Sequence, residues 1–214
     1  MKLSKGSHAS PEHGLCIMEA AAMLAGEQHN YQPQCVAPTI RVFGMNLNDM
    51  MTDDERVRLV PFVMKVVGTS GDEMLAESEQ RRAFLCADYA VRVFAPISLR
   101  AYGFEEGALT MENLPRIVDK QTAASAARYA GGYAAAAAAA ARYAATDAAA
   151  AGYTSASAVA AGCAATDAAE YAFGYAGAAA AAAGAAARYA ATDAAAAHRA
   201  LVIDKAVELF SRMM

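Results

Sequence analysis

The sequence predicts an all-α fold, with an N-terminal helical domain followed by a long-helix, alanine-rich bundle or helical hairpin. No segment shows the sustained two-residue alternation of apolar and polar side chains that a half-buried strand requires. Alanine, the best helix former, makes up more than half of residues 121–200. Proline is absent from 155–212. The change in composition near residue 120 predicts two domains, 1–120 and 121–214.

Proline, glycine and capping residues divide the first half of the chain into predicted helices. These helices span about 15–25, 38–48, a segment from Thr52 onward with a kink at Pro61, 72–94, and 110–118. Pro96 is expected to end the fourth helix, because the residue before a proline disfavours the helical conformation. Asp88 lies in an apolar run of this helix, so its charge needs a partner such as Arg92, four residues on.

The second half is predicted to contain three long helices. The first spans about 122–151 and stops at Gly152. An unbroken helix over 155–212 would be about 85 Å long, more than a compact domain accommodates. We therefore expect a turn near Gly184, or failing that near 174–177. The last helix is amphipathic, and its apolar face consists of Val202, Ala206, Leu209 and Met213.

A stripe of large polar and aromatic side chains interrupts the alanine. The segment ARYAATDAAAA occurs at 141–151 and again at 187–197, which indicates an internal duplication. With about 100° of rotation per helical residue, Tyr133, Tyr143 and Asp147 of the first predicted helix lie within roughly 40° of Tyr129. We call the following set the polar stripe: Arg128, Tyr129, Tyr133, Arg142, Tyr143, Thr146, Asp147, Asp167, Tyr171, Tyr175, Arg188, Tyr189, Thr192 and Asp193.

The polar stripe is the predicted ligand-binding site. Tyrosine offers a flat ring and a hydroxyl, arginine a planar fork of donors, and aspartate an acceptor. Together they suit a small phosphorylated or nucleotide-like ligand, or a protein partner. The competing interpretation is that the rings fill gaps between alanine helices while Arg–Asp pairs cross-link them. The density of native cores favours that packing interpretation, and alanine faces that approach closely favour a homo-oligomer.

Composition and charge exclude several classes of function. The net charge of −4, the pI near 5.6 and the lack of a Lys/Arg-rich block argue against nucleic-acid binding. No secretory signal and no membrane-spanning segment are recognised, so we expect a cytoplasmic protein without a membrane partner. The four cysteines are scattered, as in a protein with reduced thiols. No cofactor is expected.

A weak candidate metal site lies near the N-terminus. His13, Cys16 and Glu19 fall near one face of a predicted helix, and His29 and Cys35 follow across a turn. Such ligands suit zinc and would make the chain a metal-assisted hydrolase. Burial of Cys16 as a small apolar side chain is the favoured alternative.

The sequence contains no nucleophile elbow, phosphate loop or HExxH motif. A non-enzymatic binding or assembly protein is therefore the leading interpretation. A structural component of a virion or filament is a further alternative.

Several short segments resemble the opening of an uncharacterised group of helical proteins from actinobacteria and their phages. They are CIMEA at 16–20, AGE at 25–27, PQCVAP at 33–38 and DDERVRLVPFVMKVVGTSG at 53–71. The resemblance covers mainly residues 13–71, and such proteins often carry alanine-rich C-terminal repeats. It implies a phage or mobile-element accessory protein and assigns no functional residue.

Overall fold

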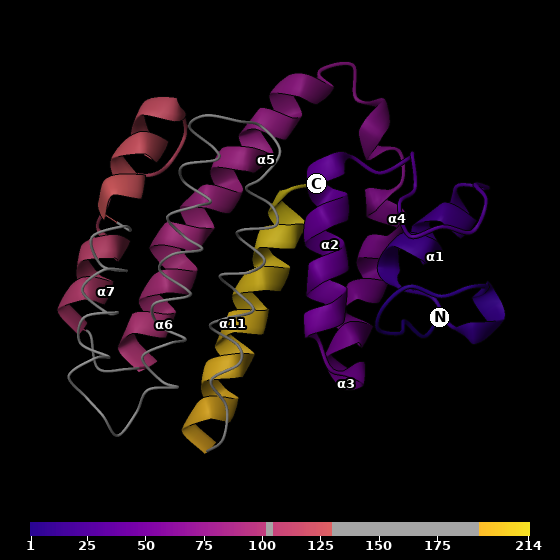
Figure 1. Ribbon diagram of the computed structural model, residues 1–214, viewed down its shortest axis with the longest axis horizontal. Coiled ribbons are helices and arrows are strands. Elements are labelled where there is room, and N and C mark those ends of the chain that lie inside the picture. Colours follow the sequence, from indigo (N-terminus) through magenta and orange to yellow (C-terminus); the bar gives the residue numbers. More distant parts are fainter. Residues whose placement is uncertain (102–104, 130–192) are drawn as a thin grey trace. The chain divides into compact units, whose positions relative to one another are not determined.

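The computed structural model describes residues 1–101, 105–129 and 193–214, and these residues form helices without a strand (Figure 1). The all-α prediction is confirmed for this part of the chain. The chain divides into two compact units, one of Met1–Arg82 with Val207–Met214 and the other of Ala83–Ala206. The predicted division at residue 120 stays a prediction, because most of 121–214 lies outside the described residues.

The first unit begins with short helices that have clear local causes. Its elements are η1 (Pro11–His13), α1 (Ile17–Leu24), α2 (Pro38–Met50), α3 (Asp53–Arg56), η2 (Val57–Phe62), α4 (Val63–Val66), η3 (Thr69–Gly71), the start of α5 (Leu75–Tyr89) and the end of α11 (Asp193–Arg212). Capping boxes at Cys16 and Thr52 begin α1 and α3. Pro61 lies in the 3₁₀ segment η2, so the predicted kink is confirmed as a change of helix type before α4.

Phe210, near the C-terminus, lies in the core of the first unit. Its ring centroid is 6.1 Å from that of Phe43 and 5.6 Å from that of Phe62. Gly44 allows this close packing, because a Cβ there would lie 2.9 Å from Met18 Cε and 3.0 Å from Phe210 Cζ. The predicted apolar face of the last helix is confirmed, since all four of its residues are buried: Val202, Ala206, Leu209 and Met213.

The second unit contains the rest of α5, the π-helix η4 (Ala90–Phe94), α6 (Ala95–Ala101), α7 (Glu105–Glu112) and a helix over 120–129; α6 packs against α7 and η4 (Figure 1). The prediction that Pro96 ends the helix is wrong, because the chain stays helical through Pro96 into α6. The physical reason is the π-turn, in which the Ala95 N–H bonds to the Ala90 carbonyl and widens the helix just before the residue without an N–H.

The predicted helix over 110–118 is also wrong. The helix in this region is α7, which ends at Glu112, and residues 113–118 form a connection to the next helix. Pro115 has no N–H to continue α7, and its ring disfavours the helical conformation at Leu114. The connection therefore follows from the proline, and it forms one side of the candidate site.

Candidate functional site

Arg128 and Tyr129 are the two members of the polar stripe whose side chains the structure describes. Asp193 is the first residue of α11. The other members lie outside the described residues: Tyr133, Arg142, Tyr143, Thr146, Asp147, Asp167, Tyr171, Tyr175, Arg188, Tyr189 and Thr192. The predicted alignment of the stripe along one helix edge therefore stays a prediction beyond Tyr129.

A side-chain cap fixes the start of the helix over 120–129. Asp119 Oδ1 accepts a hydrogen bond from the Thr122 N–H at 2.8 Å. The Thr122 hydroxyl oxygen accepts from the N–H groups of Val118 and Asp119, both at 3.1 Å. Hydrogen bonds from the Thr122 backbone and side chain hold the pKa of Asp119 below its usual range. The cap joins the helix to the preceding connection, and it already occupies the hydroxyl of Thr122.

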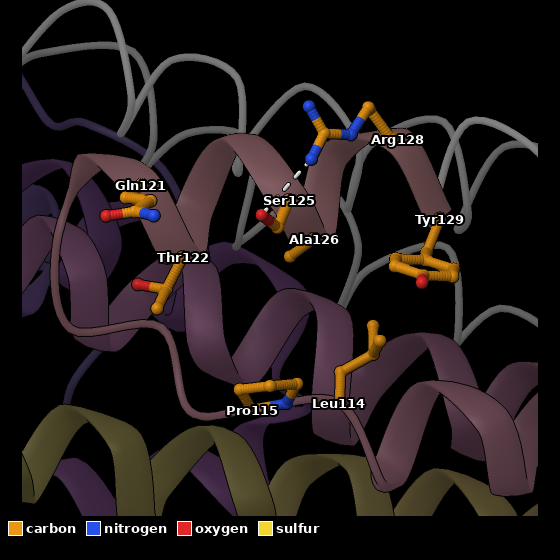
Figure 2. A pocket seen from close by; sticks show the side chains of 8 residues that line it. All are labelled: Leu114, Pro115, Gln121, Thr122, Ser125, Ala126, Arg128 and Tyr129. Atoms are coloured by element: carbon orange, nitrogen blue, oxygen red, sulfur yellow. Dashed lines mark hydrogen bonds between the residues drawn. The ribbon is translucent and has the colours of Figure 1, made fainter.

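A pocket of about 340 Å³ lies between this helix and the connection before it (Figure 2). In Figure 2 the Tyr129 ring points toward Leu114, while the Arg128 guanidinium folds back toward Ser125. Arg128 Nη2 donates to Ser125 Oγ at 3.3 Å. The volume is within the range of small-molecule sites. The lining residues are Leu114, Pro115, Gln121, Thr122, Ser125, Ala126, Arg128 and Tyr129.

The pocket combines an apolar floor with polar side chains. Leu114 and Pro115 form the floor on the side of the connection (Figure 2). Within the described residues, the Arg128 guanidinium makes a single hydrogen bond, so most of its donors have no partner in this part of the chain. The Tyr129 side chain is 52% exposed, and the Gln121 side chain is also exposed. A flat ring, a cation and an amide therefore line the same pocket.

The weak metal candidates are arranged differently, around the buried carboxylate of Glu19. Glu19 is 0% exposed and accepts from the His8 N–H at 2.6 Å, the Cys16 N–H at 2.8 Å and His8 Nδ1 at 2.8 Å. His29 Nε2 lies 3.7 Å from this carboxylate and donates to the His8 carbonyl at 2.9 Å. Burial disfavours the charged carboxylate, but the hydrogen bonds outweigh burial and hold the pKa of Glu19 below its usual range.

The remaining candidates do not join this cluster as metal ligands. His13 is exposed, and its Nδ1 bonds to Ser10 Oγ at 2.9 Å. The Cys35 N–H bonds to Glu27 at 2.7 Å. Burial raises the pKa of the Cys16 thiol to about 12, which disfavours the thiolate that a metal needs. Within 1–101, 105–129 and 193–214 no three His, Cys, Asp or Glu residues are grouped to hold a metal ion.

His8 is the residue of this cluster that sequence reasoning missed. The segment before Pro11 carries no helix signal, so none of its residues was selected as a candidate. A signal was present in Glu19, which lies in the apolar run CIMEAAAML. A carboxylate in such a run requires a buried donor, although the pattern does not say which residue supplies it.

No protein family model, curated protein or solved structure matches the chain. The resemblance to actinobacterial and phage proteins therefore stays a prediction, as do the cytoplasmic location and the homo-oligomer. Within the described part of the chain, no helix is both long and apolar enough to cross a membrane.

Proposed function

We propose that the chain is a non-enzymatic binding protein whose pocket holds a small ligand with a flat ring and an anionic group, such as a nucleoside monophosphate. The observation that carries this proposal is the presence of Arg128 and Tyr129 at one pocket of about 340 Å³. Arginine pairs with phosphate through a planar fork of donors, and tyrosine provides a face on which a base can stack.

The residue types in the pocket support binding rather than catalysis. Among the described residues, the lining contains no histidine, cysteine or carboxylate, which are the side chains that most often transfer protons or attack a substrate. The Thr122 hydroxyl is engaged in the helix cap, so it is not free to act as a nucleophile. The arrangement therefore favours holding a ligand without changing it.

The concave shape supports a small ligand rather than a protein partner. Small-molecule sites are hollows with an apolar lining and a few polar groups that orient the ligand. Leu114, Pro115 and Ala126 supply the apolar part of this pocket. Gln121, with an amide that both donates and accepts, suits the edge of a base or the hydroxyls of a sugar.

Isothermal titration calorimetry on the full chain tests the proposal with AMP, adenosine and inorganic phosphate as probes. We expect AMP to bind more tightly than either fragment, because it engages the cation and the ring together. Arg128→Ala should weaken AMP binding by about 10-fold or more, the typical loss for a hydrogen bond to a charged group. Tyr129→Ala should also weaken it, whereas Tyr129→Phe should retain most of the affinity.

Arg116→Ala provides the matched control. Arg116 is exposed in the same connection but does not line the pocket. We expect this variant to retain most of the wild-type affinity for AMP at physiological salt, since Arg116 does not line the pocket and salt weakens the interactions of exposed charges. Absence of AMP binding by the wild type, or equal losses in the Arg116 and Arg128 variants, would contradict the proposal.

A further inference from the structure

The apolar floor of the pocket belongs to a connection that is fixed on both sides by two side chains. On one side of Leu114 and Pro115, Arg92 Nη2 donates to the Glu112 carbonyl at 3.3 Å. On the other side, Asp88 Oδ1 accepts from the Ile117 N–H at 3.0 Å. The floor is therefore held between two hydrogen bonds from the α5–η4 segment.

Asp88 and Arg92 form one unit, as the sequence predicts from the charge of Asp88 in an apolar run. Arg92 Nη1 lies 3.1 Å from Asp88 Oδ1, and Asp88 is only 6% exposed. The same Asp88 oxygen thus receives both the guanidinium and the Ile117 N–H. A low local dielectric strengthens such a shared contact, and losing one partner leaves the others unsatisfied.

The π-helix η4 places Arg92 in this position. Arg92 is the central residue of Ala90–Phe94, and π-turns are uncommon and occur frequently at functional sites. A π-turn adds a residue to the turn and changes the direction in which the following side chains point. The π-turn thus contains Arg92, the residue that donates a hydrogen bond to the Glu112 carbonyl at the end of α7.

We propose that Asp88 and Arg92 are positioning residues of the ligand pocket. This inference rests on the proposed function, and it extends the site to residues that do not line it. The pair fixes the position of Leu114 relative to the Tyr129 ring, which points toward Leu114 (Figure 2). Without the pair, the connection relaxes, the spacing between floor and ring changes, and a flat ligand loses its fit.

Two measurements on Asp88→Ala and Asp88→Asn test the inference. Hydrogen exchange at the Ile117 amide should accelerate about 10-fold or more in Asp88→Ala, which removes the acceptor. The affinity for AMP should fall by about 10-fold in the same variant. Asp88→Asn retains an oxygen acceptor and should restore most of the amide protection and most of the affinity.

Arg92→Lys provides a second variant if Asp88→Ala fails to fold. A lysine is a single point donor and cannot hold both Asp88 and the Glu112 carbonyl, so AMP affinity should again decrease. Ile17→Val, which removes a buried methylene in the first unit, controls for a general loss of stability and should leave AMP affinity unchanged.

The inference would be overturned if the Ile117 amide exchanged as slowly in Asp88→Ala as in the wild type. It would also be overturned if a folded Asp88→Ala bound AMP as tightly as the wild type does. If the wild type itself does not bind AMP, the proposed function fails. The exchange of Ile117 and the chemical shifts of the Leu114 methyl groups then still decide whether Asp88 positions the floor. Unchanged Leu114 shifts in Asp88→Ala would overturn it.

Discussion

Two polar clusters of this protein differ in burial and in the number of hydrogen bonds that the protein itself provides. In the first unit, the Glu19 carboxylate is fully buried and accepts three hydrogen bonds from His8 and Cys16. In the second unit, Arg128 and Gln121 are exposed at the rim of a pocket, and Arg128 makes one hydrogen bond within the described residues. The protein's own donors satisfy the Glu19 carboxylate, whereas most donors of Arg128 have no partner among the described residues.

This difference in burial and hydrogen bonding helps to distinguish a structural cluster from a ligand-binding one. A buried charge must be paired and hydrogen-bonded, so the contacts of the Glu19 carboxylate are explained by the fold alone. Exposed donors beside an apolar floor are typical of a small-molecule site, which is the role that we propose for Arg128 and Gln121. Variants should therefore affect mainly stability at Glu19 and mainly ligand affinity at the pocket.

The largest expected effect is on stability, in Glu19→Ala. The change leaves the N–H groups of His8 and Cys16 without their acceptor and also removes the capping box of α1. We expect the free energy of unfolding to fall by roughly 3–5 kcal/mol, the range for breaking a buried charged network. Urea denaturation followed by circular dichroism measures the change.

Glu12→Ala is the matched control for this variant. Glu12 is exposed on η1, four residues before Cys16. Its removal should leave the urea midpoint close to that of the wild type, because its hydrogen bond with Ser10 is exposed to solvent and surface substitutions have small effects. Equal midpoints for the two variants would show that Glu19 is not a structural centre, and the comparison between the clusters would fail.

A smaller effect is expected in the pH dependence of stability. The folded-state pKa of Glu19 lies below its unfolded value near 4.5, so folding favours the ionised form. The resulting stability is present above pH 4.5 and is lost as the pH falls through the lowered folded pKa. The difference in unfolding free energy between wild type and Glu19→Gln should therefore shrink below pH 4.5.

This difference is measured by urea denaturation of both proteins at a series of pH values from roughly 3 to 7, about one pH unit apart. Other carboxylates with lowered pKa values, such as Asp72 and Glu112, titrate in both proteins and cancel in the comparison. A difference that stays constant over the whole range would contradict the assigned state of Glu19.

Much of the fold of the described residues follows from local signals in the sequence. Pro38 and Thr52 mark helix starts that the structure confirms, because a fixed φ and a side-chain cap act within one turn. Pro96 does not end its helix as predicted, since the π-turn before it relieves the strain. The pattern of residues contains no sign of this compensation, which depends on how the segment packs.

The candidate sites likewise contain some contacts that the sequence predicts and others that it does not. The pairing of Asp88 with Arg92 could be predicted, because a charge in an apolar helical run requires a partner at helical spacing. The pocket could not, since Leu114 meets Tyr129 only after the chain turns at Pro115. His8 was missed because it approaches Glu19 across a non-helical segment, where no periodicity specifies its position.

The smallest effect is expected in Gln121→Ala, at the exposed edge of the pocket. The amide is exposed, and no hydrogen bond to the rest of the described chain holds it, so the urea midpoint should not change. If the amide contacts AMP, the affinity should fall by about 2- to 10-fold, the range for a neutral hydrogen bond. Calorimetry at the same salt concentration as for Arg128→Ala makes the two losses comparable. If Gln121→Ala lowered the stability but not the AMP affinity, Gln121 would have a structural role, as Glu19 does.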